Sequence, residues 1–301
     1  MTVGPNTEES PKGQWVSDIV RVPDGTPIRY ALFKKRESFR KLLIFLNGRG
    51  DWIEKYHHLP TTLALDSEWA CLTLDHRGQG GSGGRRSHID SYSTYCNDIA
   101  YILNLVQQDA EIYLMGHSMG GLISLHSCHL KTLAPKKLVL ISPLLRLQIH
   151  PYVLKISTPL LKLVTKTPLK YNHIHRSERL DSFHDNPYTH NPTHFKELRS
   201  GRFKITQPTI GWISSTIEAT EKCFEPTFIT NFSCPILMFT GGKEKVVCSK
   251  GFKFWSSLMS RQKAVPFSLQ HISEAKHEIL NETPKILTPV AMTIKDWLEI
   301  D

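Results

Sequence analysis

Residues 113–121 of this 301-residue chain read YLMGHSMGG, in which one serine, Ser118, is bracketed by Gly116 and Gly120. The apolar run before it, residues 111–115, predicts a short buried strand, and the apolar residues beyond it recur at helical spacing. A sharp turn from strand to helix needs tiny residues two places before and two places after its centre, because strand and helix approach each other there. We therefore predict a buried strand, a strained turn at Ser118 and an amphipathic helix.

The predicted turn would place Ser118 where a nucleophile is expected. Backbone N–H groups and the positive end of the dipole at a helix N-terminus favour a developing anion. The alternative is a glycine-rich turn that merely contains a serine, since a bare G-x-S-x-G pattern arises by chance in chains of this length. A base and an acid that follow in chain order, on loops at strand ends, favour the nucleophile.

His277 is the candidate for the base among fifteen histidines. A β-like run ends near Ile272, and His277 lies in the short polar loop that follows, which is where a catalytic base is expected. His271 lies inside the β-like run. We therefore assign His271 a structural role.

Glu244 is the candidate for the acid between Ser118 and His277. Residues 234–240 predict a buried strand, and residues 241–247 turn out of it without an aspartate. The alternative interpretation of Glu244 is an exposed turn glutamate between two lysines.

Two backbone N–H groups are expected to face the same reacting carbonyl. One belongs to Met119, the residue after the nucleophile, and the other to the loop after an early strand. Residues 41–46 predict that strand, and it runs into Asn-Gly-Arg-Gly-Asp at residues 47–51, where glycine allows a close backbone approach. We choose the N–H of Arg49, and the N–H one residue away is the alternative.

Four segments together resemble the α/β-hydrolase superfamily, specifically its bacterial lysophospholipase and monoacylglycerol lipase branch, whose sequences are also labelled serine aminopeptidase-like. They are the G-R-G-D segment with its following Lys-Tyr at 48–56, D-H-R-G-Q-G-G-S at 75–82, the turn at 116–121 and K-H-E-I-L at 276–280. The likeness extends from about Val16 to about Trp297. The segment 75–82 resembles the bacterial lysophospholipases most closely.

Two positions depart from the pattern of this branch. Asn47 stands where many relatives have histidine before the glycine, and Glu244 stands where lipases of this branch usually have aspartate. The first departure affects the geometry of the N–H donors, and the second affects the assignment of the acid.

The resemblance implies a serine hydrolase that uses no cofactor and no metal ion. Ser118 would attack an ester carbonyl, His277 would take its proton, and Glu244 would orient the imidazole. The N–H groups of Arg49 and Met119 would receive the oxyanion.

The implied substrate is a small lipid ester with one acyl chain, and a lysophospholipid is preferred. Gly48, Leu160 and Leu161 are further candidates for substrate contact. Monoacylglycerol lipase and general carboxylesterase activity are the alternatives within esterases. A peptidase that binds a free amine through the acidic residues between 178 and 185 is a further alternative, and a non-catalytic binding protein of this fold is the last.

Apolar runs predict a mostly parallel eight-stranded sheet with helices on both faces, and the resemblance implies that this sheet is an α/β-hydrolase fold with an inserted cap. The expected strands are 17–22, 28–33, 42–46, 70–74, 112–115, 137–141, 236–240 and 266–272, and the expected helices follow Ile53 and Ser118 or span 93–108, 250–259 and 284–300. The core would comprise 15–142 and 221–301, after a disordered tail at 1–14.

Residues 143–220 lack the strand alternation of the core and are rich in proline, histidine and apolar clusters, which indicates a cap over the site. Within it, residues 160–164 lie between Pro159 and Pro168 and predict a short apolar helix. That helix would line an acyl tunnel or touch a membrane surface, and cap-to-core packing is the alternative. His173 and His175 have no third ligand at a metal-binding spacing.

Composition limits the location and partners of the chain. A formal charge of +9 without a nucleic-acid-binding motif excludes nucleic acid as the expected partner, and it suits either an anionic membrane surface or simple solubility. The six cysteines show no C-x-x-C spacing, and the chain shows no signal core or membrane-length apolar run. We expect a cytoplasmic protein with reduced thiols that touches membranes peripherally; the sequence does not predict its oligomeric state.

Overall fold

The computed structural model describes residues 13–106, 109–149, 151–174, 182–200, 203 and 207–300. The predicted disordered tail lies outside these ranges except for its last two residues, and the second of them, Gln14, begins the first strand.

Eight strands form one sheet in the order β1-β2-β4-β3-β5-β6-β7-β8. The first two pairings, β1 with β2 and β2 with β4, are antiparallel, and all later neighbours are parallel. This confirms the predicted sheet. The strands are β1 Gln14–Arg21, β2 Pro27–Lys34, β3 Lys41–Leu46, β4 Trp69–Leu74, β5 Glu111–His117, β6 Lys137–Ile141, β7 Ile236–Gly241 and β8 Phe267–Ile272.

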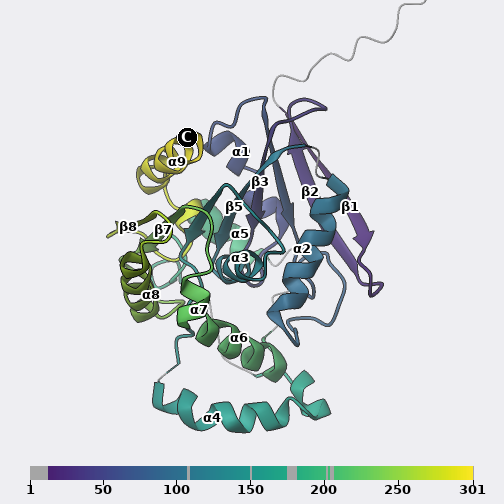
Figure 1. The fold of residues 1–301 in the computed structure, drawn as a ribbon, viewed down its shortest axis with the longest axis vertical. Coiled ribbons are helices and arrows are strands. Elements are labelled where there is room, and N and C mark those ends of the chain that lie inside the picture. Colours follow the sequence, from purple (N-terminus) through teal and green to yellow (C-terminus); the bar gives the residue numbers. More distant parts are fainter. Residues whose placement is uncertain are drawn as a thin grey trace, which may run out of the picture.

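Helices cover both faces of this sheet (Figure 1). Side chains of β3 alternate between the two layers: Leu42 and Ile44 join the hydrophobic cluster formed with α2, α3 and α8, whereas Leu43 and Phe45 join the cluster formed with α1 and α9. The helices of the two layers are α2 Tyr92–Val106, α3 Met119–His129 and α8 Ser249–Gln262 on one face, and α1 Leu59–Thr62 and α9 Pro284–Glu299 on the other. Short 3-10 turns are η1 Ile53–Tyr56 and η3 Ile279–Asn281.

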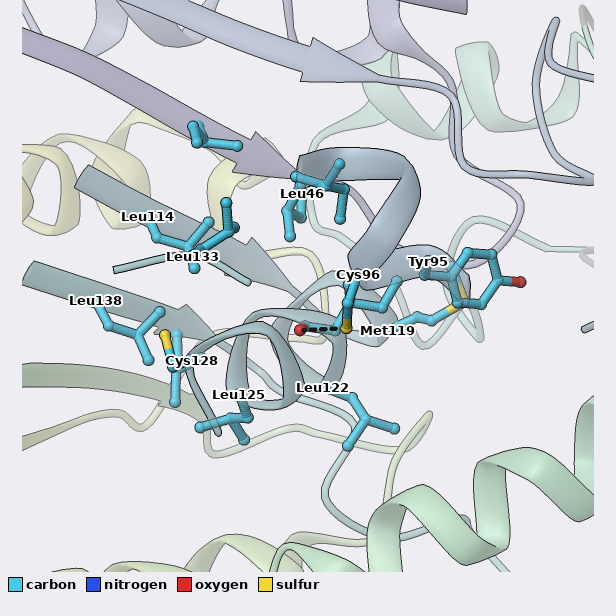
Figure 2. Close-up of a cluster of buried hydrophobic side chains, with 14 of the residues drawn as sticks. Leu46, Tyr95, Cys96, Leu114, Met119, Leu122, Leu125, Cys128, Leu133 and Leu138 are labelled. Atoms are coloured by element: carbon cyan, nitrogen blue, oxygen red, sulfur yellow. Dashed lines mark hydrogen bonds between the residues drawn. The ribbon is translucent and has the colours of Figure 1, made fainter. Parts of the chain in front are cut away.

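Helix α3 differs from the expected amphipathic helix because every residue from Met119 to Cys128 is buried. It packs on β5, and helices α2 and α6 (Ile210–Lys222) cover it from outside. Figure 2 shows Leu122, Leu125 and Cys128 of this helix among side chains of the sheet and of α2. The helix therefore has no solvent face, and an apolar core surrounds the start of the helix on which Ser118 lies.

The chain leaves the sheet between β6 and β7 and forms four helices and one 3-10 turn within the described residues of that stretch. They are α4 Pro151–Val164, η2 Pro168–Tyr171, α5 Pro192–Arg199, α6, and α7 Pro226–Ile229. Figure 1 shows α4 as the outermost of them, with α6 between it and the sheet. The expected short helix after Pro159 is wrong in its start, since Pro159 lies inside the longer α4.

Candidate active site

The turn between β5 and α3 holds Ser118 in a strained conformation with φ 52° and ψ −115°. A side chain at Gly120 would overlap the carbonyl oxygen of Leu46, and one at Gly116 would overlap Gly120 and the Ser124 hydroxyl. Both glycines are therefore required by close backbone approach rather than by their own torsion angles, which agrees with the reasoning from sequence.

The imidazole of His277 contacts both of the side chains that the sequence analysis grouped with it. Its Nε2 lies 2.9 Å from the Ser118 hydroxyl oxygen, and its Nδ1 lies 2.7 Å from Glu244 Oε2. The side chains of His277 and Glu244 are 3% and 1% exposed, so water competes little for these bonds. With the proton on Nδ1, the ring donates to the carboxylate and its Nε2 accepts from the hydroxyl.

Glu244 follows β7, and backbone N–H groups hold its carboxylate. The N–H groups of Val246 and Val247 donate to Oε1 at 2.7 and 3.1 Å, which leaves Oε2 for His277. Burial opposes ionisation of Glu244, but His277 and the two N–H donors outweigh it and lower the pKa of the carboxyl. The interpretation of Glu244 as an exposed turn residue is therefore wrong.

The backbone donors expected near Ser118 lie on two elements. Met119 is the first residue of α3, whose first-turn N–H groups have no partner within the helix. Arg49 follows β3 and lies with Gly48 in the wall of the cavity beside Ser118. The N–H groups of Gly48 and Gly50 donate to the side chains of Asp51 and Gln79, so an offset of one residue would break an existing hydrogen bond.

A cavity of about 190 Å³ opens at Ser118 and His277. Most of its wall is apolar, and several of the apolar residues belong to the stretch between β6 and β7. The wall includes Leu144, Leu147, Ile149, Ile174, Pro208, Trp212, Ile213, Val246 and Val247, together with Arg49, Gln148, Tyr188 and Gln207. An acyl chain fits such a wall better than a charged group does.

Leu160 and Leu161 are not part of this wall, whereas Gly48 is. The expectation that these leucines line the cavity is therefore not met by the structure. The physical reason is their place on α4, which lies on the far side of α6 from the sheet (Figure 1), and Leu160 is 61% exposed.

Three charged side chains next to the site had no role assigned from the sequence. Lys55, Asp51 and Glu278 are buried, and Asp51 and Glu278 line the cavity. Their positions belong to the G-R-G-D and K-H-E segments that carried the family resemblance. Asp51 and Lys55 are four residues apart, but no local sequence pattern links Glu278 to them.

Other groups considered from the sequence lie apart from this site. Among the described residues, no three His, Cys, Asp or Glu side chains gather closely enough to hold a metal ion. His173 contacts the carbonyl oxygen of Gln207, and His175 lies outside the described residues. All six cysteines are free thiols.

An eight-stranded, mostly parallel sheet with a strained serine turn between a central strand and a buried helix defines an α/β-hydrolase. A family model described as "Serine aminopeptidase, S33" matches residues 37–284, and the chain belongs to this family.

Several relatives whose names state an activity match this chain at modest identity. The chain is 25% identical to a probable lysophospholipase L2 of Haemophilus influenzae over 89% of this chain and 87% of the relative. It is 31% identical to a monoglyceride lipase of Rattus norvegicus over 44% of this chain and 41% of that protein. A soluble variant of a Saccharomyces cerevisiae monoglyceride lipase, solved with a substrate analog, has the same fold, with a TM-score of 0.76, 20% identity and 94% of each chain covered.

Proposed function

We propose that this protein is a serine hydrolase that cleaves carboxylic esters of lipids with one acyl chain, and that lysophospholipids are its preferred substrates. The observation that carries the proposal is the chain of contacts from Glu244 through His277 to Ser118, which lies in the wall of a mostly apolar cavity. Relatives described as lysophospholipase and monoglyceride lipase support the substrate class.

The geometry suits a two-step acyl transfer, in which Ser118 is first acylated and then deacylated by water. His277 Nε2 takes the Ser118 proton as the hydroxyl oxygen attacks the ester carbonyl, and the N–H groups of Met119 and Arg49 receive the oxyanion. The C–O bond to the alcohol then breaks, His277 gives its proton to the leaving alcohol, and the acyl group stays on the Ser118 oxygen as an ester. A water molecule, deprotonated by the same nitrogen, releases the fatty acid and restores Ser118. Glu244 stays ionised throughout and holds the imidazole in place.

The stretch 143–220 serves as a cap in this proposal, and 15–142 with 221–301 serves as the catalytic core. Ile174, Pro208, Trp212 and Ile213 of the stretch line the cavity, so it supplies part of the surface that would contact an acyl chain. Helix α6 also packs on α2 and α3 of the core, which fixes its place over the site.

A monoacylglycerol lipase is the second candidate, because the same apolar cavity would accept an acyl chain with a neutral head group. An aminopeptidase needs acidic groups for a free amine. Of the acidic residues considered for that purpose, Asp185 does not line the cavity, and Glu178 and Asp181 lie outside the described residues. Rates on lysophosphatidylcholine, lysophosphatidylethanolamine, monoolein, p-nitrophenyl esters and aminoacyl amides test the proposal, which fails if only the amides are cleaved.

We expect the Arg49 side chain to distinguish a phosphorylated head group from a neutral one. Its guanidinium stacks over Trp212 at 5.4 Å from the ring centroid, and Arg49 is the one basic side chain among the described residues of the cavity wall, histidine aside. A lysophospholipid phosphate would gain a charge-assisted bond that monoolein lacks. We expect Arg49→Gln to lower kcat/KM about tenfold on lysophosphatidylethanolamine and less than about twofold on monoolein.

Arg146→Gln is the matched control for this experiment. Arg146 stacks over Phe224 at 5.2 Å from the ring centroid but does not line the cavity, so its loss should leave both rates unchanged. If Arg49→Gln lowers kcat/KM equally on the two lipids, the Arg49 side chain does not bind the phosphate.

We also propose that α4 touches anionic membrane surfaces. Leu160 and Leu163 are 61% and 63% exposed, and Lys162 and Lys166 beside them are exposed as well. Within the described ranges, no helix is long and apolar enough to cross a bilayer. Contact would therefore be peripheral, through leucines at the lipid boundary and lysines near the head groups.

Lys162→Gln should weaken binding to anionic vesicles about fivefold at low salt, because a lysine near such a surface contributes about 1 kcal/mol. Cosedimentation with phosphatidylglycerol and phosphatidylcholine vesicles measures this. Lys253→Gln, at an exposed lysine of α8, should have no effect. Equal binding of the wild type to anionic and neutral vesicles would contradict electrostatic recruitment.

A further inference from the structure

A cluster of buried charged side chains lies beside the candidate site, and Glu278, the residue after His277, is its centre. The Glu278 side chain is 4% exposed, and both of its oxygens are engaged. Oε1 accepts from Lys55 Nζ at 2.8 Å, and Oε2 lies 2.5 Å from His194 Nε2 and accepts from Asn281 Nδ2 at 3.3 Å. Such a carboxylate is costly to bury unless these partners are kept.

Lys55 connects Glu278 to the loop that carries the proposed oxyanion donor. Its ammonium group, which is fully buried, also pairs with Asp51. Asp51 in turn accepts from the N–H of Gly48 at 2.9 Å and from the Tyr56 hydroxyl at 2.8 Å. Gly48 directly precedes Arg49, so the position of this loop is tied through Lys55 to the residue next to His277.

The stretch 187–194 connects Glu278 to the segment inserted between β6 and β7. His194 lies in α5, whose first turn is capped by Asn191. Carbonyl oxygens of Pro187 and Tyr188 accept from the N–H groups of His277 and Glu278 at 3.3 and 2.9 Å. The inserted segment therefore contacts the His277 loop through these two backbone bonds and through side-chain bonds, among them the contact of His194 with Glu278.

The charges in this cluster compensate one another. Burial opposes ionisation of Glu278, but Lys55 and His194 outweigh it and lower its pKa to about 2. Burial likewise opposes protonation of Lys55, but Asp51 and Glu278 raise its pKa. Lys55 is shared between the carboxylates of Asp51 and Glu278, so His194 supplies a further donor to Glu278 beside Asn281.

We propose that the contact between His194 and Glu278 is a positioning contact. Through it the inserted segment holds His277 at a fixed position relative to the oxyanion loop, which is the loop at residues 47–51 that carries the Arg49 N–H. This inference rests on the proposed function. Neither side chain has to touch the reacting atoms. Its effect is on the geometry of Ser118, His277 and the N–H donors, for which displacements near 1 Å cost about a hundredfold in rate.

Two polar substitutions at His194 separate positioning from folding. Gln places an amide N–H₂ near the position of Nε2 and keeps the bond to Glu278, whereas Asn is too short to reach it. We expect His194→Asn to lower kcat at least tenfold on p-nitrophenyl butyrate with KM within about twofold, and His194→Gln to keep most of the wild-type kcat. Rates are divided by the fraction of enzyme that a fluorophosphonate titrates, and thermal unfolding is followed for each variant.

His190→Asn is the matched control. His190 Nδ1 contacts Glu282 at 2.8 Å and so joins the same two segments, but among the described residues this pair makes no hydrogen bond to the oxyanion loop, and His190 does not line the cavity. Its kcat per titrated site should stay within about twofold of wild type.

The outcomes distinguish the inference from the proposed function. A purely structural role for His194 would lower the unfolding temperature of both His194 variants while leaving kcat per titrated site unchanged, and that result overturns the inference. Equal kcat losses in His194→Asn and His190→Asn would overturn it as well. If instead the wild type neither hydrolyses esters nor reacts with the fluorophosphonate, the proposed function itself fails.

Discussion

Ser118→Ala is expected to abolish ester hydrolysis while the protein stays folded. The hydroxyl is the proposed nucleophile, and its oxygen is the atom that His277 Nε2 contacts at 2.9 Å. Loss of a serine nucleophile costs on the order of a millionfold in kcat, because the remaining groups have no oxygen to activate. The hydroxyl makes no cap bond to α3, so its removal leaves the turn intact. Hydrolysis of p-nitrophenyl butyrate and fluorophosphonate labelling measure the loss.

Ser142→Ala is the control for this variant. Like Ser118, Ser142 is buried at a strand end with a positive φ, 43°, and its hydroxyl has no hydrogen-bond partner among the described residues. This control variant should hydrolyse and label like wild type. Activity in Ser118→Ala equal to that of the control would mean that another residue attacks the ester.

The strands could be predicted from sequence because their signal is local. Apolar runs such as residues 42–46 and 70–74 are buried on both faces of a parallel sheet, and turn residues such as Gly25 separate the runs. Seven of the eight predicted strands begin and end within two residues of the observed bounds, whereas β1 begins three residues earlier than predicted, at Gln14. The exposed edge strand β1 gives a weaker apolar pattern, since Val16 and Ile19 face solvent.

Features that depend on distant packing could not be predicted in this way. The spacing of apolar residues in α3 predicts an amphipathic helix, but α2 and α6 cover the outer face of α3, so its polar residues are buried as well. The leucines of α4 look like a cavity lining in sequence, although α4 lies outside α6. Position along the chain does not reveal which face of such an inserted helix meets the core.

The candidate site likewise has a part that could be predicted from sequence and a part that could not. Ser118, His277 and Glu244 each follow a recognisable strand, and the carboxyl ends of parallel strands meet at one edge of the sheet, so their proximity follows from topology. The cluster around Glu278 is different, because His194 is 84 residues away and Lys55 is 223 residues away in sequence. No local pattern specifies those pairs.

Glu244→Gln is expected to lower kcat about ten-thousandfold, which is the cost of losing the carboxylate that orients a histidine base. The substituted amide would donate to His277 Nδ1 and leave the ring proton on Nε2, where it blocks acceptance of the Ser118 proton. Folding should be kept, because the amide oxygen can still accept from the N–H groups of Val246 and Val247. Steady-state rates and the rate constant of fluorophosphonate labelling should fall together.

Glu274→Gln is the matched control, because this glutamate lies near the same loops but is exposed and pairs with Lys243. An exposed ion pair of this kind contributes little, so the control should keep the wild-type rate. Glu244→Asp gives a second test: aspartate restores a carboxylate with a shorter reach, so its kcat should lie well above that of the Gln variant. If the Gln variant stays within about tenfold of wild type, Glu244 is not the group that orients His277, because the tautomer argument requires the larger loss.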